Sequence, residues 1–139
     1  MHIQRLQDLA AMVCKQLGTG KKALGGAMTT KKAALRALMD YRRLRSIAGM
    51  LRLQLEETPR KTRKWNTLNR KLLSVTQKME TIECAVEELE GEERELLTME
   101  FITAPIARQQ IISRLSVSES TFYRVRRAAI RHYLRNFGV

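Results

Sequence analysis

Side chains that can hydrogen-bond to nucleic-acid bases or phosphates are concentrated between residues 118 and 131. They are Ser118, Glu119, Ser120, Thr121, Tyr123, Arg124, Arg126, Arg127 and Arg131. An arginine guanidinium can donate two parallel hydrogen bonds to a guanine base or contact a phosphate, and a hydroxyl group can bond to either. Residue types of this kind in one short segment indicate recognition of DNA rather than bond-making chemistry.

Two short helices joined by a three-residue turn are predicted to position these side chains. Ile111 and Leu115 lie four residues apart and share one face of the first helix. The second helix has its own apolar stripe, formed by Phe122, Val125, Ala129 and Tyr133. Ser118 is expected to cap the second helix with its hydroxyl. Packing of the two stripes against each other predicts a helix-turn-helix whose second helix enters the major groove.

The side of the second helix on which a polar residue falls predicts its contacts. The outward-facing residues are Glu119, Ser120, Tyr123, Arg124 and Arg127. Those nearest the helix start are expected to reach base edges. Arg126, Arg131 and Arg135 are better placed for phosphates or solvent. The alternative interpretation is a basic, solvated helix in a small bundle, but the turn and the phase of the apolar stripe favour the helix-turn-helix.

The charge of the chain agrees with a polyanionic partner. The sequence has 26 Lys and Arg against 14 Asp and Glu, and a pI of about 10.4. A pI above about 9 is typical of nucleic-acid-binding domains. Residues 80–100, with nine acidic side chains and one basic, separate two basic regions. This block is interpreted as a solvated helix face, or alternatively as a patch that repels DNA and so orients the module.

Apolar residues at helical spacing run through the rest of the chain, and no strand pattern competes with them. An amphipathic helix is predicted over residues 3–17, followed by a flexible basic linker up to residue 28. The next helix is expected to be capped by Thr29 or Thr30 and to end near Glu57, before a proline.

A heptad pattern follows that proline. Its members are Trp65, Leu68, Leu72, Val75, Met79, Ile82, Val86 and Leu89. Alternating spacings of three and four predict coiled-coil packing. The fold class is therefore predicted to be all-α, with a long antiparallel helical hairpin over residues 29–90 and a helix-turn-helix domain over residues 91–139, after an N-terminal region of residues 1–28. The hairpin seam can close within one chain or between two, so a homodimer through the coiled coil is one alternative.

A second basic patch is predicted at the tip of the hairpin, formed by Arg60, Lys61, Arg63 and Lys64. It is either a solvated surface or a second contact with DNA phosphates or an acidic protein. The same two interpretations apply to the basic run from Arg42 to Arg45.

Enzymatic, metal-binding and membrane functions are not expected. The two histidines, two aspartates and two cysteines of the chain have no spacing typical of a catalytic or metal site. No run of 18 apolar residues could span a membrane, and charged residues interrupt the N-terminal segment where a secretion signal would need an apolar core. We therefore expect a cytoplasmic protein that is not an enzyme and needs no cofactor.

Two segments resemble a known group of proteins. Residues 34–47, Ala-Leu-Arg-Ala-Leu-Met-Asp-Tyr-Arg-Arg-Leu-Arg-Ser-Ile, look like the helical opening of small phage proteins. Residues 89–97, Leu-Glu-Gly-Glu-Glu-Arg-Glu-Leu-Leu, match their "Leu-x-x-x-Glu-Arg-x-Leu-Leu" segment. The group includes the ArpU- and RinA-type phage transcriptional regulators of late, packaging or lysis genes. Their C-terminal module is similar to region 4 of sigma factors, which reads the −35 promoter element. The resemblance implies a bacterial host cytoplasm, promoter DNA and RNA polymerase.

The resemblance also implies roles for individual residues. Ser118 would cap the recognition helix, and Thr121 and Arg127 would lie near phosphates. The implied base-reading residues are Glu119, Ser120, Tyr123 and Arg124. Two positions depart from the group: Ile112 replaces a small residue, and Ser116 replaces a glycine of the turn. Ile112 is expected to push the two helices apart, and Ser116 to adopt a less favoured backbone conformation.

Two other functions fit the same sequence features. A small terminase-like DNA-packaging subunit also combines a helix-turn-helix with oligomerising helices. A helical adaptor that binds RNA polymerase through the hairpin would have only weak affinity for promoter DNA by itself.

Overall fold

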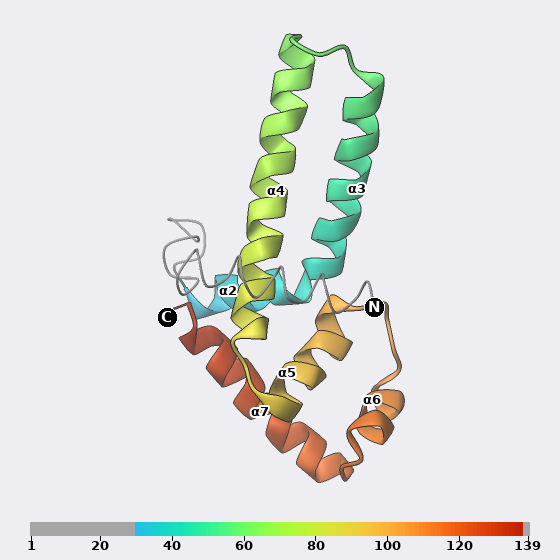
Figure 1. Cartoon of the computed structure of the whole chain (residues 1–139). Helices are drawn as coiled ribbons and strands as arrows, with labels where there is room; N and C mark the ends of the chain where they lie inside the picture. The colour runs from blue at the N-terminus through green and yellow to red at the C-terminus, as the bar shows by residue number, and fades with distance from the viewer. Residues whose placement is uncertain (1–29, 138–139) are drawn as a thin grey trace.

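The computed structural model describes residues 30–137, and every regular element in that range is a helix (Figure 1). The elements are α2 (Lys31–Met39), α3 (Tyr41–Glu57), α4 (Arg63–Glu87), α5 (Gly91–Leu97), the π-helix η2 (Thr98–Ile102), α6 (Arg108–Leu115) and α7 (Glu119–Arg135). The all-helical fold expected from the sequence is therefore confirmed for this part of the chain. The helix predicted over residues 3–17 and the linker up to residue 28 lie outside the described residues.

Hydroxyl side chains cap the N-termini of three of the described helices. Thr30, Thr62 and Ser118 each accept a hydrogen bond from the backbone N–H three residues further on, at 3.1–3.2 Å. Such a bond occupies one of the backbone donors that the first turn of a helix leaves free. The capping roles predicted for Thr30 and Ser118 are confirmed, whereas the cap at Thr62 is additional.

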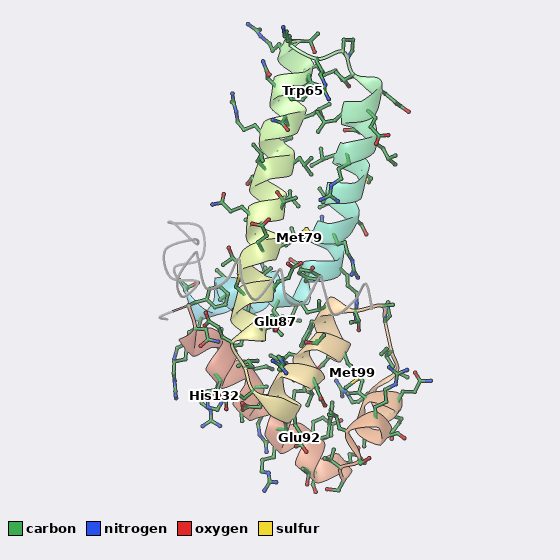
Figure 2. The ribbon with its side chains drawn as sticks, viewed as in Figure 1. Trp65, Met79, Glu87, Glu92, Met99 and His132 are labelled. Atoms are coloured by element: carbon green, nitrogen blue, oxygen red, sulfur yellow. The ribbon has the colours of Figure 1, made fainter. Side chains whose placement is uncertain are left out.

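Helices α3 and α4 lie side by side and run in opposite directions (Figure 1). We call α3 together with residues 63–80 of α4 the arm. Trp65 lies near the tip of the arm and Met79 between its two helices, nearer the other end (Figure 2). The heptad positions from Trp65 to Met79 are only half-buried, because no third helix covers them. The last heptad residue, Leu89, lies beyond the end of α4 at Glu87, so the predicted continuous helical seam is too long.

The single helix predicted from Thr30 to Glu57 is instead two helices, which meet at Asp40. In Figure 1, α2 lies across the end of the α3–α4 pair rather than in line with α3. Packing explains the break, since Leu38 of α2 is fully buried in the core below the arm. Tyr41 begins α3 and donates its hydroxyl hydrogen bond to Glu83 of α4. The apolar spacing continues through Asp40, so the pattern could not reveal the change of direction.

The main core lies at the opposite end from the arm's tip, in a region that we call the base. The base comprises α2, the end of α4 from Thr81, α5, η2, α6 and α7. The core is formed by residues of the base together with Tyr41 from the start of α3. The buried residues are Ala34, Leu38, Tyr41, Ile82, Ala85, Val86, Leu89, Leu96, Leu97, Ile111, Ile112, Phe122, Ala129, Tyr133 and Phe137. The Tyr133 hydroxyl donates a 2.9 Å hydrogen bond to the carbonyl of Ala34, which joins α7 to α2 across 99 positions of sequence. This core therefore crosses the boundary predicted between residues 90 and 91.

Candidate nucleic-acid interface

Three residues connect α6 to α7. They are Ser116, Val117 and Ser118. Ser116 has φ 55° and ψ 44°, in the left-handed region that glycine adopts most easily. The N–H groups of Ser116 and Val117 donate to carbonyls of the last turn of α6, which ends that helix tightly. The less favoured conformation expected at Ser116 is thus confirmed.

Helices α6 and α7 are positioned through α5. Both pack on α5, and α6 also packs on η2, whereas α6 and α7 contact each other little. Residues of both apolar stripes, Ile111 of α6 and Phe122 of α7 among them, belong to one core cluster that they share with α5. Ile112 is only 9% exposed and fills part of the core on this side.

One face of α7 carries four arginines. They are Arg124, Arg127, Arg131 and Arg135, spaced by three and four residues on the side opposite the buried Phe122, Ala129 and Tyr133. All four are exposed, and none of them forms an ion pair with another residue in the described part of the chain. They extend over about 16 Å at 1.5 Å per residue. We call them the α7 arginine face, which also includes the exposed Ser120 near the helix start.

The start of α7 is held in a hydrogen-bonded turn. The Ser118 oxygen accepts the Thr121 N–H and lies 2.9 Å from the Thr121 hydroxyl and 3.2 Å from that of Ser120. Glu119 lies in the first turn, where a negative charge stabilises the helix dipole. Ser118, Glu119 and Ser120 are exposed, and Thr121 is half-buried. The hydroxyls of Ser118 and Thr121 therefore form hydrogen bonds within the first turn of α7.

Arg108, at the start of α6, orients Tyr123 of α7. Its guanidinium donates a 3.0 Å hydrogen bond to the Tyr123 hydroxyl and lies 5.4 Å from the centre of that ring. The same guanidinium lies 3.9 Å from a carboxylate oxygen of Glu100. Arg108 is not predicted from the sequence as a site residue, because 15 residues separate it from Tyr123 and no local pattern links them.

Arg126 differs from the other arginines of α7, because it is paired inside the protein. Its Nε lies 2.9 Å from both carboxylate oxygens of Glu100, and its guanidinium lies 5.8 Å from the ring centre of Phe101. On the same helix, Nδ1 of His132 lies 2.8 Å from a carboxylate oxygen of Glu93. Glu93 and Glu100 therefore hold α7 against α5 and η2. For these two residues the interpretation of the acidic block as a solvated or DNA-repelling face is wrong.

Arg42 connects the arm to the π-helix. From α3 it donates hydrogen bonds to the carbonyls of Thr103 at 2.7 Å and Glu100 at 2.8 Å, and a longer one to Met99 at 3.4 Å. A π-helix is rare, and its last carbonyls need partners outside the helix. The interpretation of Arg42 as a solvated or phosphate-contacting residue is therefore wrong, since it supports the element that carries Glu100.

The predicted basic patch at the tip of the arm lies far from α7 (Figure 1). Its members Arg60, Lys61, Arg63 and Lys64 are all exposed, and none forms an ion pair with a described residue. Arg63 and Lys64 belong to the first turn of α4 rather than to the loop. The fold thus separates the two predicted basic sites by the length of the arm.

Within residues 30–137 no three His, Cys, Asp or Glu side chains are grouped so that they could bind a metal ion. None of the helices in this range has the length and apolar character needed to cross a bilayer.

Comparison with known proteins gives one match. The model of a family described as "Protein of unknown function (DUF1492)" matches residues 62–134, which is more than half of the chain. No curated protein and no solved structure matches the chain. The matched range begins at the cap of α4 and ends within α7, so it contains Arg124, Arg127 and Arg131 of the α7 arginine face, whereas Arg135 and the helix α2 that packs on α7 lie outside it. The chain belongs to the DUF1492 family.

Proposed function

We propose that the protein binds double-stranded DNA, with α6 and α7 acting as a helix-turn-helix and α7 lying in the major groove. The observation that carries the proposal is the division of the arginines near α7. Arg108 and Arg126 are paired with Glu100, whereas the four arginines of the α7 arginine face have no acidic partner among the described residues. Guanidinium groups that the fold does not neutralise are suited to phosphates and base edges.

The dimensions of α7 suit a DNA groove. Its 17 residues extend for about 25 Å, and a helix with its side chains is about 10–12 Å across, close to the 12 Å width of the major groove. The three-residue turn leaves the start of α7 exposed, and Ser120 and Arg124 lie near that start. We assign base contacts to Glu119, Ser120, Tyr123 and Arg124, and phosphate contacts to Arg127 and Arg131. We assign no DNA contact to Arg126, because its guanidinium is paired with the Glu100 carboxylate.

We further propose that the bound DNA is a promoter and that the protein is a phage or prophage transcriptional regulator. This part rests on the resemblance to the ArpU- and RinA-type regulators and to sigma region 4. The basic tip of the arm, well separated from α7, would then be free to contact RNA polymerase.

The test is selection of bound DNA from a random library, followed by titration of the enriched sequence and of random DNA at several salt concentrations. Arg124→Ala should cost about 1–3 kcal/mol on the enriched sequence and much less on random DNA. Arg131→Ala should weaken both and reduce the slope of log affinity against log salt by about 0.9. Arg52→Ala removes one exposed charge from the arm and serves as the matched control.

Two outcomes would contradict the proposal. In the first, no sequence is enriched and the α7 variants bind like the wild type. In the second, Arg52→Ala weakens binding as much as Arg131→Ala, which would show that affinity follows overall charge rather than the α7 arginine face.

A further inference from the structure

The outward face of α3 presents apolar side chains that no other described element covers. Met50 and Leu53 are 60% and 63% exposed, although helix α3 buries Ala48 and Leu51 on its opposite side. The outward stripe consists of Arg43, Ser46, Met50, Leu53 and Glu57, at alternating spacings of three and four. We call it the α3 outer stripe. The hydroxyl of Ser46 bonds to a carbonyl within α3, so it adds little polarity to the stripe.

The charges of the α3 outer stripe are arranged symmetrically about its centre. Arg43 lies seven residues before Met50, and Glu57 lies seven residues after it. Neither charged residue forms an ion pair within the described chain. If a second α3 packed antiparallel on the first with the two Met50 side chains in contact, each Arg43 would face the Glu57 of the other copy. A parallel arrangement would instead oppose like charges, which is unfavourable.

We propose that two copies of this chain associate through the α3 outer stripe, antiparallel and about a twofold axis near Met50. A twofold contact requires a surface that is complementary to itself. Pairing about Met50 matches Arg43 with Glu57 and places Leu53 opposite Ile47 of the other copy. Gly49 beside Met50 leaves open space, since a Cβ there would have no atom within 4 Å. A partner helix can therefore approach closely at the centre.

The two faces of α4 are less suitable for contact with a second copy. The α4 heptad positions already face α3 of the same chain, so the dimer seam considered from the sequence is occupied. The outer side of α4 bears the exposed residues Arg63, Arg70, Lys71 and Lys78, and a second copy would bring the same positive charges against them. The α3 outer stripe combines apolar side chains with balanced charge.

The dimer should be weak, and its geometry should separate the two α7 helices. The surface area buried between two helices of about 25 Å is smaller than the 1,200–2,000 Å² buried in a typical stable interface. We therefore expect a dissociation constant on the order of 10 μM. Because α7 lies at the Tyr41 end of α3 (Figure 1), antiparallel pairing places the two copies of α7 at opposite ends of the dimer. If the proposed DNA binding holds, the two half-sites would lie more than one α3 length apart.

Sedimentation equilibrium of the full chain without DNA, from about 1 to 200 μM, tests the proposal. The wild type should change from monomer to dimer over this range, and Leu53→Asp should remain monomeric. Leu73→Asp is the matched control, because Leu73 is equally exposed, at 61%, on α4, and it should dimerise like the wild type. Circular dichroism should show unchanged helicity for both variants, since neither side chain is buried.

Charge exchange tests the antiparallel register. Arg43→Glu and Glu57→Arg should each weaken the dimer at least tenfold, and the double variant should restore it. The proposal is overturned if the wild type stays monomeric, if Leu73→Asp dissociates the dimer instead of Leu53→Asp, or if the double variant fails to restore association. A ring of eight or more copies would also overturn it and favour the DNA-packaging alternative. None of these outcomes depends on DNA binding, so failure of the dimer would leave the proposed DNA binding standing.

Discussion

The base and the arm are both built from amphipathic helices, but they differ in how completely their apolar side chains are covered. In the base, five helices and η2 surround one core, and large residues such as Phe122, Leu96 and Tyr133 are fully buried. In the arm, two helices cover each other on one side only, so the residues from Trp65 to Met79 stay half-exposed. We therefore expect the base to supply most of the stability and to fix α7, whereas the arm extends surface into solvent.

The largest expected effect comes from removing a large side chain from the base. Phe122→Ala should lower the free energy of unfolding by about 3–5 kcal/mol, because it leaves a cavity in a closed core. Leu72→Ala in the half-exposed arm should cost only about 1 kcal/mol, because its position is already partly hydrated. Urea unfolding followed by circular dichroism measures both, and equal losses would show that the arm is as well closed as the base.

The sequence predicts the helices better than their directions. The caps at Thr30 and Ser118, and the short helix, turn and long helix ending the described chain, follow from local patterns. The break at Asp40 does not, because the apolar spacing passes through it and tertiary contacts of Leu38 and Tyr41 decide it. Periodicity reports which residues are buried, but not which partner buries them.

An intermediate effect is expected from a single hydroxyl in the base. Tyr133→Phe keeps the ring but removes the buried hydrogen bond to the Ala34 carbonyl, which should lower stability by about 1 kcal/mol. Tyr123→Phe is the matched control, because its hydroxyl bonds to the exposed Arg108 and its loss should be close to zero. If both variants unfold at the same urea concentration, the contact between α2 and α7 contributes nothing.

A smaller effect, of opposite sign, is expected at the turn before α7. Ser116→Gly should raise the free energy of unfolding by about 0.5–1 kcal/mol, because glycine adopts the left-handed conformation without strain. Ser113→Gly, at an exposed position inside α6, should instead lower it by about 0.5 kcal/mol. Thermal unfolding of the two variants measures both changes in stability. If Ser116→Gly were destabilised, residue 116 would not have the left-handed conformation.

The smallest effect concerns pH at the junction of base and arm. Burial raises the pKa of Glu83 above its ordinary value near 4.5, although the hydrogen bond from Tyr41 opposes the shift. The folded state then binds the proton more tightly than the unfolded state. Its stabilising contribution is complete below about pH 4.5 and is lost as the pH rises through the raised pKa.

Glu83→Gln should therefore flatten the pH dependence of unfolding between mildly acidic and neutral pH. Glu56→Gln, which removes an exposed carboxylate of α3, should leave the slope of unfolding free energy against pH as it is in the wild type. Urea titrations across this pH range make the comparison, and a variant Glu83→Gln with the wild-type slope would show that Glu83 does not titrate there.

In the candidate interface, too, features set by residues close in sequence are predictable, whereas contacts between residues far apart in sequence are not. The helical spacing of Arg124, Arg127 and Arg131 is visible in the sequence, and the structure places them on one exposed face. The pairing of Arg126 with Glu100 is not visible, because 26 residues separate them and the π-helix that carries Glu100 has no sequence pattern. Ser116 is an exception, since its backbone conformation is predicted from the resemblance, in which glycine stands at this position of the turn.

The hydrogen bonds made by Arg42 and by the Ala34 carbonyl limit how far the chain can be shortened without exposing the base. The range shared with the DUF1492 family, residues 62–134, contains α7 and η2 but neither of these two residues. A fragment cut at the family boundary would leave the η2 carbonyls without the Arg42 guanidinium and the Tyr133 hydroxyl without its acceptor. It would also uncover the core surface that α2 and Tyr41 close. The range matched by the family model is thus smaller than the part of the chain that closes this core.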